Sequence, residues 1–317
     1  MEQVLIIGQQ MISFVILIAI GYLAVRLKVL DQRGLATVAS LVIRVFLPML
    51  IFTNTINGAT AEILLQCSSI IVAVFVMDFL LWGLGICTGR LGRLGGETYR
   101  AHQAMCVFGN MGFIGIPLLL ALFPQHGMAY LAAYTVPDQL LLWTLGVRLT
   151  TPKGSSAPDW KQNLKKMVNP CTAAITLAVI FVFAGIELPE IVNKTLTSVG
   201  GVSGTISLIY IGGLFYYAEW SKTFTRPAAY LIVVCKMLVA PVVVYVLVLL
   251  CRIPQEISFF LAISASMPVM ASLSMVANEN GSDGEYVLSG VVVTTACCIL
   301  TIPAVGWLTS LAGAWLL

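Results

Sequence analysis

Long apolar runs, separated by short groups of charged residues, glycine and proline, fill most of the chain. A membrane-spanning helix needs about 20 predominantly apolar residues. Ten runs of this kind can be placed, near residues 4–25, 35–56, 63–87, 101–123, 128–149, 169–186, 195–217, 227–250, 257–277 and 286–314. The pattern therefore predicts an all-α polytopic membrane protein with about ten transmembrane helices.

Composition supports this fold class. The 317 residues are 59% hydrophobic and only 10% charged, with a mean hydropathy of +0.97, whereas soluble domains carry roughly 25% charged residues. The net charge of +3 is too small to indicate a nucleic-acid partner. The eight cysteines form no CxxC pair and have no histidine at ligand spacing, so they are interpreted as apolar side chains. No metal and no other cofactor is expected.

Basic residues are unevenly distributed among the predicted loops. Most of the 17 lysines and arginines follow the first, third, fifth and seventh spans, whereas the opposite loops hold only Lys194 and Arg252. Loops rich in lysine and arginine usually remain in the cytoplasm. The distribution therefore predicts an extracytoplasmic position for both termini, which requires an even number of crossings.

The longest connection, about residues 150–168, combines proline, glycine, serine and lysine, which is typical of a flexible cytoplasmic linker. It separates residues 1–149 from residues 169–317, and each half contains five predicted spans. Because five is odd, the halves enter the membrane in opposite directions. This arrangement predicts two inverted five-helix repeats.

The fourth span of each half contains helix-breaking residues near its centre. They are Gly109, Asn110, Gly112, Gly115 and Pro117 in one span, and Pro268 with Ser264, Ser266, Ser272 and Ser274 in the other. Glycine costs up to about 1 kcal/mol and proline about 3 kcal/mol inside a helix. The broken segments must face protein or water, because lipid cannot satisfy the freed backbone groups.

Helices four and nine run in opposite directions, so their breaks are expected to cross. The half-helix N-termini would then offer unpaired N–H groups and a partial positive charge, which suit an anion or a carboxylate. The alternative is a pair of kinks that serve helix packing alone.

Further motifs extend this pattern along nearly the whole chain. Besides Gly109-Asn110-x-Gly112-x-x-Gly115-x-Pro117 and the Pro268 segment, they are Trp143-Thr144-x-Gly146, Asn169-Pro170, Gly185-x-x-Leu188-Pro189 and Thr301-Ile302-Pro303. In this order and spacing the chain resembles the auxin efflux carriers and their bacterial relatives, which include malonate and malate permeases. The plant carriers' long central loop is absent, which favours a bacterial-type member in the inner (plasma) membrane.

The resemblance implies crossed broken helices four and nine, organic-anion transport and a homodimer. It also implies an elevator-like movement of spans three to five and eight to ten against spans one, two, six and seven. The substrate contacts carried over by the resemblance are Asn110, Met111, Ser266, Met267 and Val269, with Asn54 as a weaker addition. One departure is Asp138-Gln139, where relatives are expected to have an asparagine-like residue.

Ionisable residues within predicted spans are functional candidates because the membrane interior makes them costly. These candidates are Asp78, Asp138 with its neighbour Gln139, Lys236 and Arg44. Asp138 is expected near Asn110, where it could carry a proton in each cycle. A carboxylate and Lys236 could form a pair, and Arg44 could pair or attract an anion. The alternative for the aspartates and the lysine is a structural ion pair that locks two helices.

Catalytic functions fit the sequence less well. Gly201-Val-Ser203-Gly204 matches the GxSG pattern of rhomboid-like proteases, but no later histidine exists to activate the serine. Asp78 and Asp138 lack the GxGD context of an intramembrane aspartyl pair, and Walker and HExxH motifs are absent. We therefore expect no enzyme but a secondary carrier of a small organic anion such as malonate, malate or an auxin-like acid, with a proton as the candidate coupling ion. The alternatives left open are a sodium-coupled carrier of the bile-acid-symporter kind, a channel and an intramembrane hydrolase.

Overall fold

A computed structural model describes residues 2–58, 60, 62, 68–152, 170–218, 220–223 and 226–316, and every regular element within them is a helix. The first half contains α1 (Glu2–Arg26), α2 (Gln32–Leu41), η1 (Val42–Phe46), α3 (Leu47–Gly58), α5 (Ser68–Leu91), α6 (Gly96–Val107), η2 (Met111–Gly115), α7 (Ile116–Leu122), α8 (Gly127–Leu141), η3 (Leu142–Gly146) and α9 (Val147–Leu149). The second half contains α11 (Pro170–Ala184), α12 (Glu190–Gly201), α13 (Ser203–Tyr217), α14 (Trp220–Thr223), α15 (Pro227–Val234), η4 (Cys235–Val239), α16 (Ala240–Leu250), α17 (Gln255–Ala265), α18 (Leu273–Glu279) and α19 (Gly284–Leu316). The segments labelled η are π-helical.

Six helical stretches are long and apolar enough to cross a membrane. They are Val4–Arg26, Gln32–Gly58, Ser68–Leu91, Glu190–Tyr217, Pro227–Leu250 and Gly284–Trp315. Helices also occupy the other four predicted spans, where they are shorter or interrupted. Large apolar side chains such as Leu5, Ile12, Val72 and Leu300 are more than half exposed, which a lipid surround explains. The prediction of an all-α polytopic membrane protein is confirmed.

The predicted linker of residues 150–168 lies mostly outside the described residues, as does Asn169 of the Asn169-Pro170 motif. The start of the linker is described. Thr150 is buried and its hydroxyl accepts a 3.1 Å hydrogen bond from Nδ2 of Asn280. The first residue of the predicted linker is therefore part of the packed protein.

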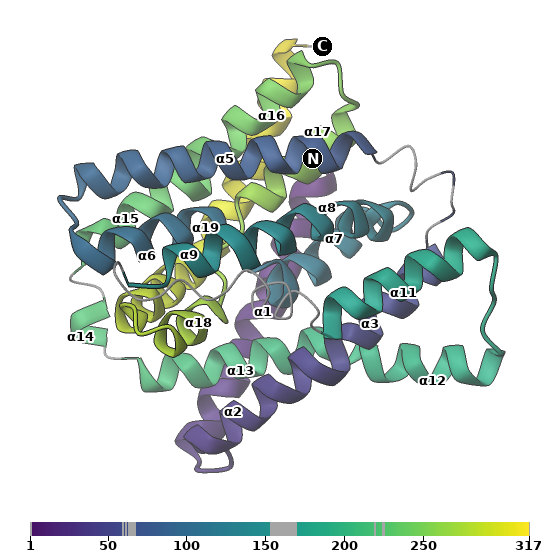
Figure 1. Cartoon of the computed structure of the whole chain (residues 1–317), viewed down its shortest axis with the longest axis horizontal. Coiled ribbons are helices and arrows are strands. Elements are labelled where there is room, and N and C mark those ends of the chain that lie inside the picture. Colours follow the sequence, from purple (N-terminus) through teal and green to yellow (C-terminus); the bar gives the residue numbers. More distant parts are fainter. Residues whose placement is uncertain are drawn as a thin grey trace.

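By their contacts we divide the helices into two groups (Figure 1). In the first group α1 packs against α13, and α3 packs against α11 and α12. In the second group α5 lies beside α6 and α8, α16 lies beside α17, and α19 contacts α15 and α18. Contacts of α1 with α7 and α19, of α3 with α8 and of α13 with η2 join the two groups.

Glycines allow the two helices at the centre of the first group to approach closely. A Cβ added at Gly21 of α1 would lie 2.0 Å from the carbonyl oxygen of Ile209, and one at Gly212 of α13 would lie 2.0 Å from that of Ile18. No side chain fits at either position. Small residues of this kind are the usual means by which membrane helices pack backbone to backbone.

Candidate functional site

The interruptions of the fourth and ninth predicted spans lie against each other. Between α6 and η2, and again between α17 and α18, the chain leaves the helical conformation, and Gly109 faces Val269 in an isolated antiparallel bridge. The N–H of Asn110 donates a 2.7 Å hydrogen bond to the carbonyl of Pro268, and the N–H of Met270 donates a 3.1 Å bond to the carbonyl of Phe108. We call these two interruptions, residues 108–110 and 266–272, the crossing.

Residue types in the first interruption explain its shape. A Cβ added at Gly109 would lie 2.9 Å from Cβ of Met267, closer than real Cβ contacts allow, so only glycine fits this approach. The Oδ1 atom of Asn110 accepts a 3.4 Å hydrogen bond from the N–H of Phe113 and so caps the following segment. Pro117 lies in the first turn of α7, where a missing N–H costs little.

The expectation of unpaired backbone amides at the crossing is wrong for its central residues. The N–H groups of Asn110 and Met270 bond across the crossing, and that of Val269 donates a 3.0 Å bond to Oγ1 of Thr294 in α19. The two interruptions therefore satisfy each other's backbone, as a low-dielectric interior requires. An anion would have to use side chains here or displace these bonds.

The serine hydroxyls near Pro268 form hydrogen bonds with backbone carbonyls of their own segment. Ser264 donates to the carbonyl of Phe260 at 2.8 Å, Ser266 to that of Ile263 at 2.7 Å and Ser274 to that of Ala271 at 3.0 Å. Ser266, Met267 and Val269 are completely buried. This side of the crossing is closed to solvent in the described conformation.

One polar side-chain atom at the crossing has no hydrogen-bond partner among the residues that the structure describes. Asn110 is 2% exposed, and its Nδ2 atom forms no hydrogen bond with the described residues. Buried polar atoms are nearly always hydrogen-bonded, so an unpartnered donor indicates a missing ligand, ion or water. Asn110 is therefore the side chain of the crossing that is best placed to bind a ligand.

Three buried charged residues gather near the end of α6, the helix that leads into the crossing. Asp78 comes from α5, Asp138 from α8 and Lys236 from η4, and they are close enough to interact electrostatically. None is more than 6% exposed. We call Asp78, Asp138 and Lys236 the charged group. The sequence named all three, and the structure brings them together.

Lys236 is held by the end of the first half-helix. Its Nζ atom donates a 3.1 Å hydrogen bond to the carbonyl of Met105, in the last turn of α6. The last carbonyls of a helix lack intrahelical partners and carry a partial negative charge, so a cation is favourable there. The break of α6 therefore supplies a partner for the buried ammonium group.

The carboxylates of Asp78 and Asp138 have fewer or longer hydrogen bonds than the ammonium group of Lys236. Tyr134 and Gln139 each donate a 3.4 Å hydrogen bond to Asp138, whereas neither carboxylate oxygen of Asp78 has a hydrogen-bond partner among the described residues. The expected direct pairing of a carboxylate with Lys236 is wrong for this conformation, since no N–O distance of 4.0 Å or less joins these described side chains. Two carboxylates thus share the surroundings of one ammonium group.

The remaining sequence candidates lie on η1, on α3 and at the start of η2. Arg44 is exposed on η1, three residues before Leu47, and a Cβ added at Gly112 would lie 3.3 Å from Cδ2 of that leucine. Asn54 is half-buried on α3, and Met111 is buried at the start of η2. Within the described residues, no hydrogen bond joins the side chain of Arg44 or Asn54 to that of Asn110.

The sequence analysis did not identify a buried hydrogen-bond network around His102. His102 is completely buried, with Nε2 2.9 Å from the hydroxyl of Thr88 and Nδ1 2.8 Å from that of Tyr286. It thereby joins α5, α6 and α19. Neither pattern nor spacing indicates these partners, because they come from distant parts of the chain. Thr294, whose hydroxyl oxygen accepts the hydrogen bond from Val269, was not identified from the sequence for the same reason.

The serine of the GxSG segment has no histidine partner in the described part of the chain. Ser203 is buried and its Oγ atom makes no hydrogen bond there, while His102 bonds Thr88 and Tyr286 and His126 lies 3.4 Å from Glu256. A Cβ added at Gly204 would lie 3.0 Å from Cγ of Pro117. The small residues here allow α13 to approach α7.

Comparison with known proteins agrees with the geometry. A family model described as a membrane transport protein matches residues 6–159 and 159–305. The chain is 22% identical over 296 residues to an uncharacterized transporter of Methanocaldococcus jannaschii, covering 92% of this chain and 96% of that protein. It is 24% identical over 304 residues to an uncharacterized transporter of Methanothermobacter thermautotrophicus, covering 93% and 96%. Because the family model spans nearly the whole sequence, this chain belongs to the membrane transport protein family of the auxin efflux carriers.

Proposed function

We propose that the protein is a secondary transporter that binds a small organic anion at the crossing. The observation that carries the proposal is the Nδ2 atom of Asn110, a buried donor without a described partner at the point where two interrupted helices meet. A carboxylate oxygen is a suitable acceptor for it. The substrate class that fits is a small carboxylate such as malonate, malate or an auxin-like acid.

The anion site extends from Asn110 to the facing helices. The backbone of Gly109, Gly112, Pro117 and Pro268 shapes the crossing, Met111, Ser266, Met267 and Val269 line it, and Asn54 and Arg44 contribute from the first group of helices. Arg44 supplies a positive charge on η1 that attracts the anion. Leu47 is close to Arg44 in sequence and lies against Gly112. It therefore brings the helix that carries Arg44 close to the crossing.

Charge balance supports proton coupling. The charged group contains two potential negative charges and one positive charge, and an isolated net charge is costly in a buried site. A proton on Asp138 or Asp78 would restore neutrality. Release of this proton would change the charge beside Asn110 and so link the protonation of the carboxylates to anion binding. Gln139 holds Asp138 in place through its side-chain amide.

The grouping of the helices supports an elevator-type movement. All the elements of the crossing and of the charged group, from α5 to α9 and from α15 to α19, belong to the second group of helices. The second group would move as a unit against α1, α3, α11, α12 and α13. The contacts that must then slide include Leu47 with Gly112 and Phe113 with Tyr210, whose rings lie 6.0 Å apart.

The same proposal includes the topology expected from the sequence. Residues 1–149 and 169–317 would form two inverted five-helix repeats, with the basic loops in the cytoplasm and both termini outside the plasma membrane. A homodimer through the first group of helices would provide a stationary frame for the movement.

A sodium-coupled carrier is the second candidate. The two carboxylate oxygens of Asp78 have no described hydrogen-bond partner, and carboxylate oxygens are suitable ligands for a hard cation. Sodium could supply the missing positive charge in place of a proton. The hydroxyl groups of Ser264, Ser266 and Ser274 donate their protons to backbone carbonyls, which leaves their oxygen lone pairs able to bind a cation.

Flux measurements on the full chain in proteoliposomes test the proposal. Labelled malonate, malate and indole-3-acetate are offered with an imposed pH gradient, an imposed sodium gradient or neither. We expect saturable uptake of at least one carboxylate that responds to the pH gradient. A response to sodium alone would select the second candidate, and the absence of carboxylate flux under all three conditions would refute organic-anion transport.

A further inference from the structure

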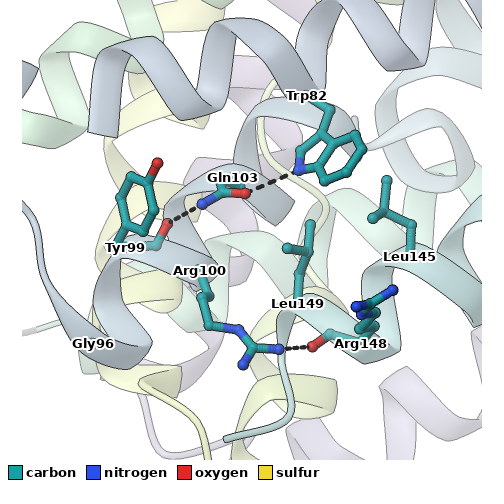
Figure 2. Close-up of a pocket in the computed structure, with 8 residues that line it drawn as sticks. All are labelled: Trp82, Gly96, Tyr99, Arg100, Gln103, Leu145, Arg148 and Leu149. Atoms are coloured by element: carbon teal, nitrogen blue, oxygen red, sulfur yellow. Dashed lines mark hydrogen bonds between the residues drawn. The ribbon is translucent and has the colours of Figure 1, made fainter. Parts of the chain in front are cut away.

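A cavity of about 490 Å³ lies apart from the crossing, between α5, α6 and the end of α9 (Figure 2). Its lining residues include Trp82, Arg100, Gln103, Leu145, Arg148 and Leu149. A volume of this size lies within the range of small-molecule sites. Neither the crossing nor the charged group contributes a residue to it.

The polar end of the cavity carries two positive charges. Arg100 lies near the start of α6 and Arg148 in the last turn of α9, and a guanidinium nitrogen of Arg100 donates to the carbonyl oxygen of Arg148. In the part of the chain that the structure describes, no acidic side chain forms an ion pair with either arginine. Two guanidinium groups that line one cavity without an ion-pair partner favour an anionic ligand, and their forked geometry suits a phosphate.

The other end of the cavity is apolar and rigid. Trp82 lies more than two turns before the end of α5, and its Nε1 atom donates a 2.9 Å hydrogen bond to Oε1 of Gln103, whose Nε2 atom donates to the carbonyl of Tyr99 at 3.4 Å. Leu145 and Leu149 complete this wall. The polar atoms of the wall are thus occupied by one another, and the surface left for a ligand is apolar.

The apolar wall continues onto the outer surface of the protein. The ring of Phe79 lies 6.3 Å from that of Trp82 and the residue is 51% exposed. Leu140 on α8, which packs beside α5, is 40% exposed. Exposed apolar side chains on membrane-spanning helices face the acyl chains of lipids. The cavity therefore has its charged end near the helix ends and its apolar end towards the hydrocarbon region.

We propose that this cavity binds an anionic phospholipid, with the phosphate between Arg100 and Arg148 and the upper part of an acyl chain along Trp82, Leu145 and Phe79. A soluble anion would use the arginines but leave the apolar wall exposed. A zwitterionic lipid would bring its own positive charge close to both guanidinium groups. Because α5, α6 and α9 all belong to the second group of helices, the lipid would bind within that group and move with it.

Titration of the purified full-length protein in detergent tests the proposal. Phosphatidylglycerol, phosphatidylcholine or inorganic phosphate is added, and binding is followed by the shift in melting temperature and by native mass spectrometry of retained lipid. We expect saturable binding of phosphatidylglycerol, weaker binding of phosphatidylcholine and no protection by inorganic phosphate. Equal binding of both lipids, or protection by inorganic phosphate that competes with phosphatidylglycerol, would overturn the assignment.

Matched variants locate the site. Arg100→Gln combined with Arg148→Gln removes both cavity charges, whereas Arg26→Gln combined with Arg90→Gln removes two exposed charges that do not line the cavity. We expect the first pair to weaken phosphatidylglycerol binding by roughly thirtyfold, because each basic residue near an anionic lipid contributes about 1 kcal/mol, and the second pair to change it less than about twofold. The same loss in both pairs would show diffuse attraction and overturn the site.

A variant without charge change keeps the test valid if the double arginine variant does not fold. Leu145→Trp fills the apolar end of the cavity and leaves both guanidinium groups in place. We expect it to reduce phosphatidylglycerol retention as strongly as the loss of the arginines. Unchanged retention in a folded Leu145→Trp protein would contradict binding inside the cavity.

Discussion

The backbone N–H of Asn110 donates a 2.7 Å hydrogen bond to the carbonyl of Pro268, which joins two helices whose interruptions are more than 150 residues apart in sequence. The reciprocal bond from Met270 to Phe108 makes the connection two-sided. Each interruption exposes backbone groups that lipid cannot satisfy, and each supplies the missing partners of the other. The two broken helices therefore form one structural unit.

Gly109→Ala should damage this unit. The new Cβ would lie 2.9 Å from Cβ of Met267, so the two interruptions must separate. Forced overpacking typically costs about 1–3 kcal/mol. We expect a lower melting temperature in detergent and loss of carboxylate flux in proteoliposomes.

Gly83→Ala is the matched control for this substitution, because nothing lies within 4 Å of a Cβ added at Gly83 of α5. Alanine also favours a helix over glycine. The control should keep its flux and its melting temperature. A Gly109→Ala protein as active and stable as this control would show that close approach at the crossing is not required.

Asp138→Asn tests the coupling of transport to protons. Asn cannot exchange a proton, so the variant should transport carboxylate at a rate that no longer responds to a pH gradient. Uptake at fixed substrate concentration across a range of external pH, with and without an imposed gradient, measures this response. Glu190→Gln, an exposed carboxylate paired with Lys194 at the surface, serves as control. Acid stimulation that persists in Asp138→Asn would assign the proton to another group.

Lys236→Met tests the charge balance of the charged group. The substitution leaves two buried carboxylates without a cation, and removal of one partner from a buried ionic group typically costs about 3–5 kcal/mol. Adding Asp78→Asn to Lys236→Met removes a negative charge and should restore part of the lost stability. Unfolding titrations of the single and double variants measure the difference. Additive losses would show that Asp78 and Lys236 do not interact.

Gly21→Ala tests the packing of the first group of helices. A Cβ at this position would lie 2.0 Å from the carbonyl oxygen of Ile209, so α1 and α13 must move apart. We expect a marked fall in melting temperature, whereas Gly8→Ala on the same helix has open space around the new Cβ and should be neutral. Equal melting temperatures of the two variants would contradict the close crossing of α1 and α13.

Patterns local in sequence were sufficient to predict much of the fold. Apolar runs predicted the helices, and the clustered glycines and Pro117 marked where one of them breaks, because these residues destabilise a helix wherever they occur. Asp78, Asp138 and Lys236 stood out because charge is rare within a span.

Partnerships between distant residues could not be predicted in this way. The amides expected to be free at the crossing are bonded to Pro268, Phe108 and Thr294, and the choice of these partners depends on how helices pack in three dimensions. Lys236 bonds the carbonyl of Met105 instead of a carboxylate, because the broken end of α6 offers an unpaired acceptor. The cavity lined by Arg100 and Arg148 was not predicted for the same reason, because its walls come from segments that are far apart in sequence.

Carboxylate flux through Asn110→Ala compared with Asn57→Ala tests the central claim most directly. Asn57 is an exposed amide at the end of α3 that pairs with Asn193 away from the crossing, so its loss controls for the removal of an amide as such. Both proteins are reconstituted at equal amounts, and their fold is checked by melting temperature. The account predicts that Asn110→Ala loses saturable uptake while Asn57→Ala retains it. Unchanged uptake by a folded Asn110→Ala protein would contradict an anion site at the crossing.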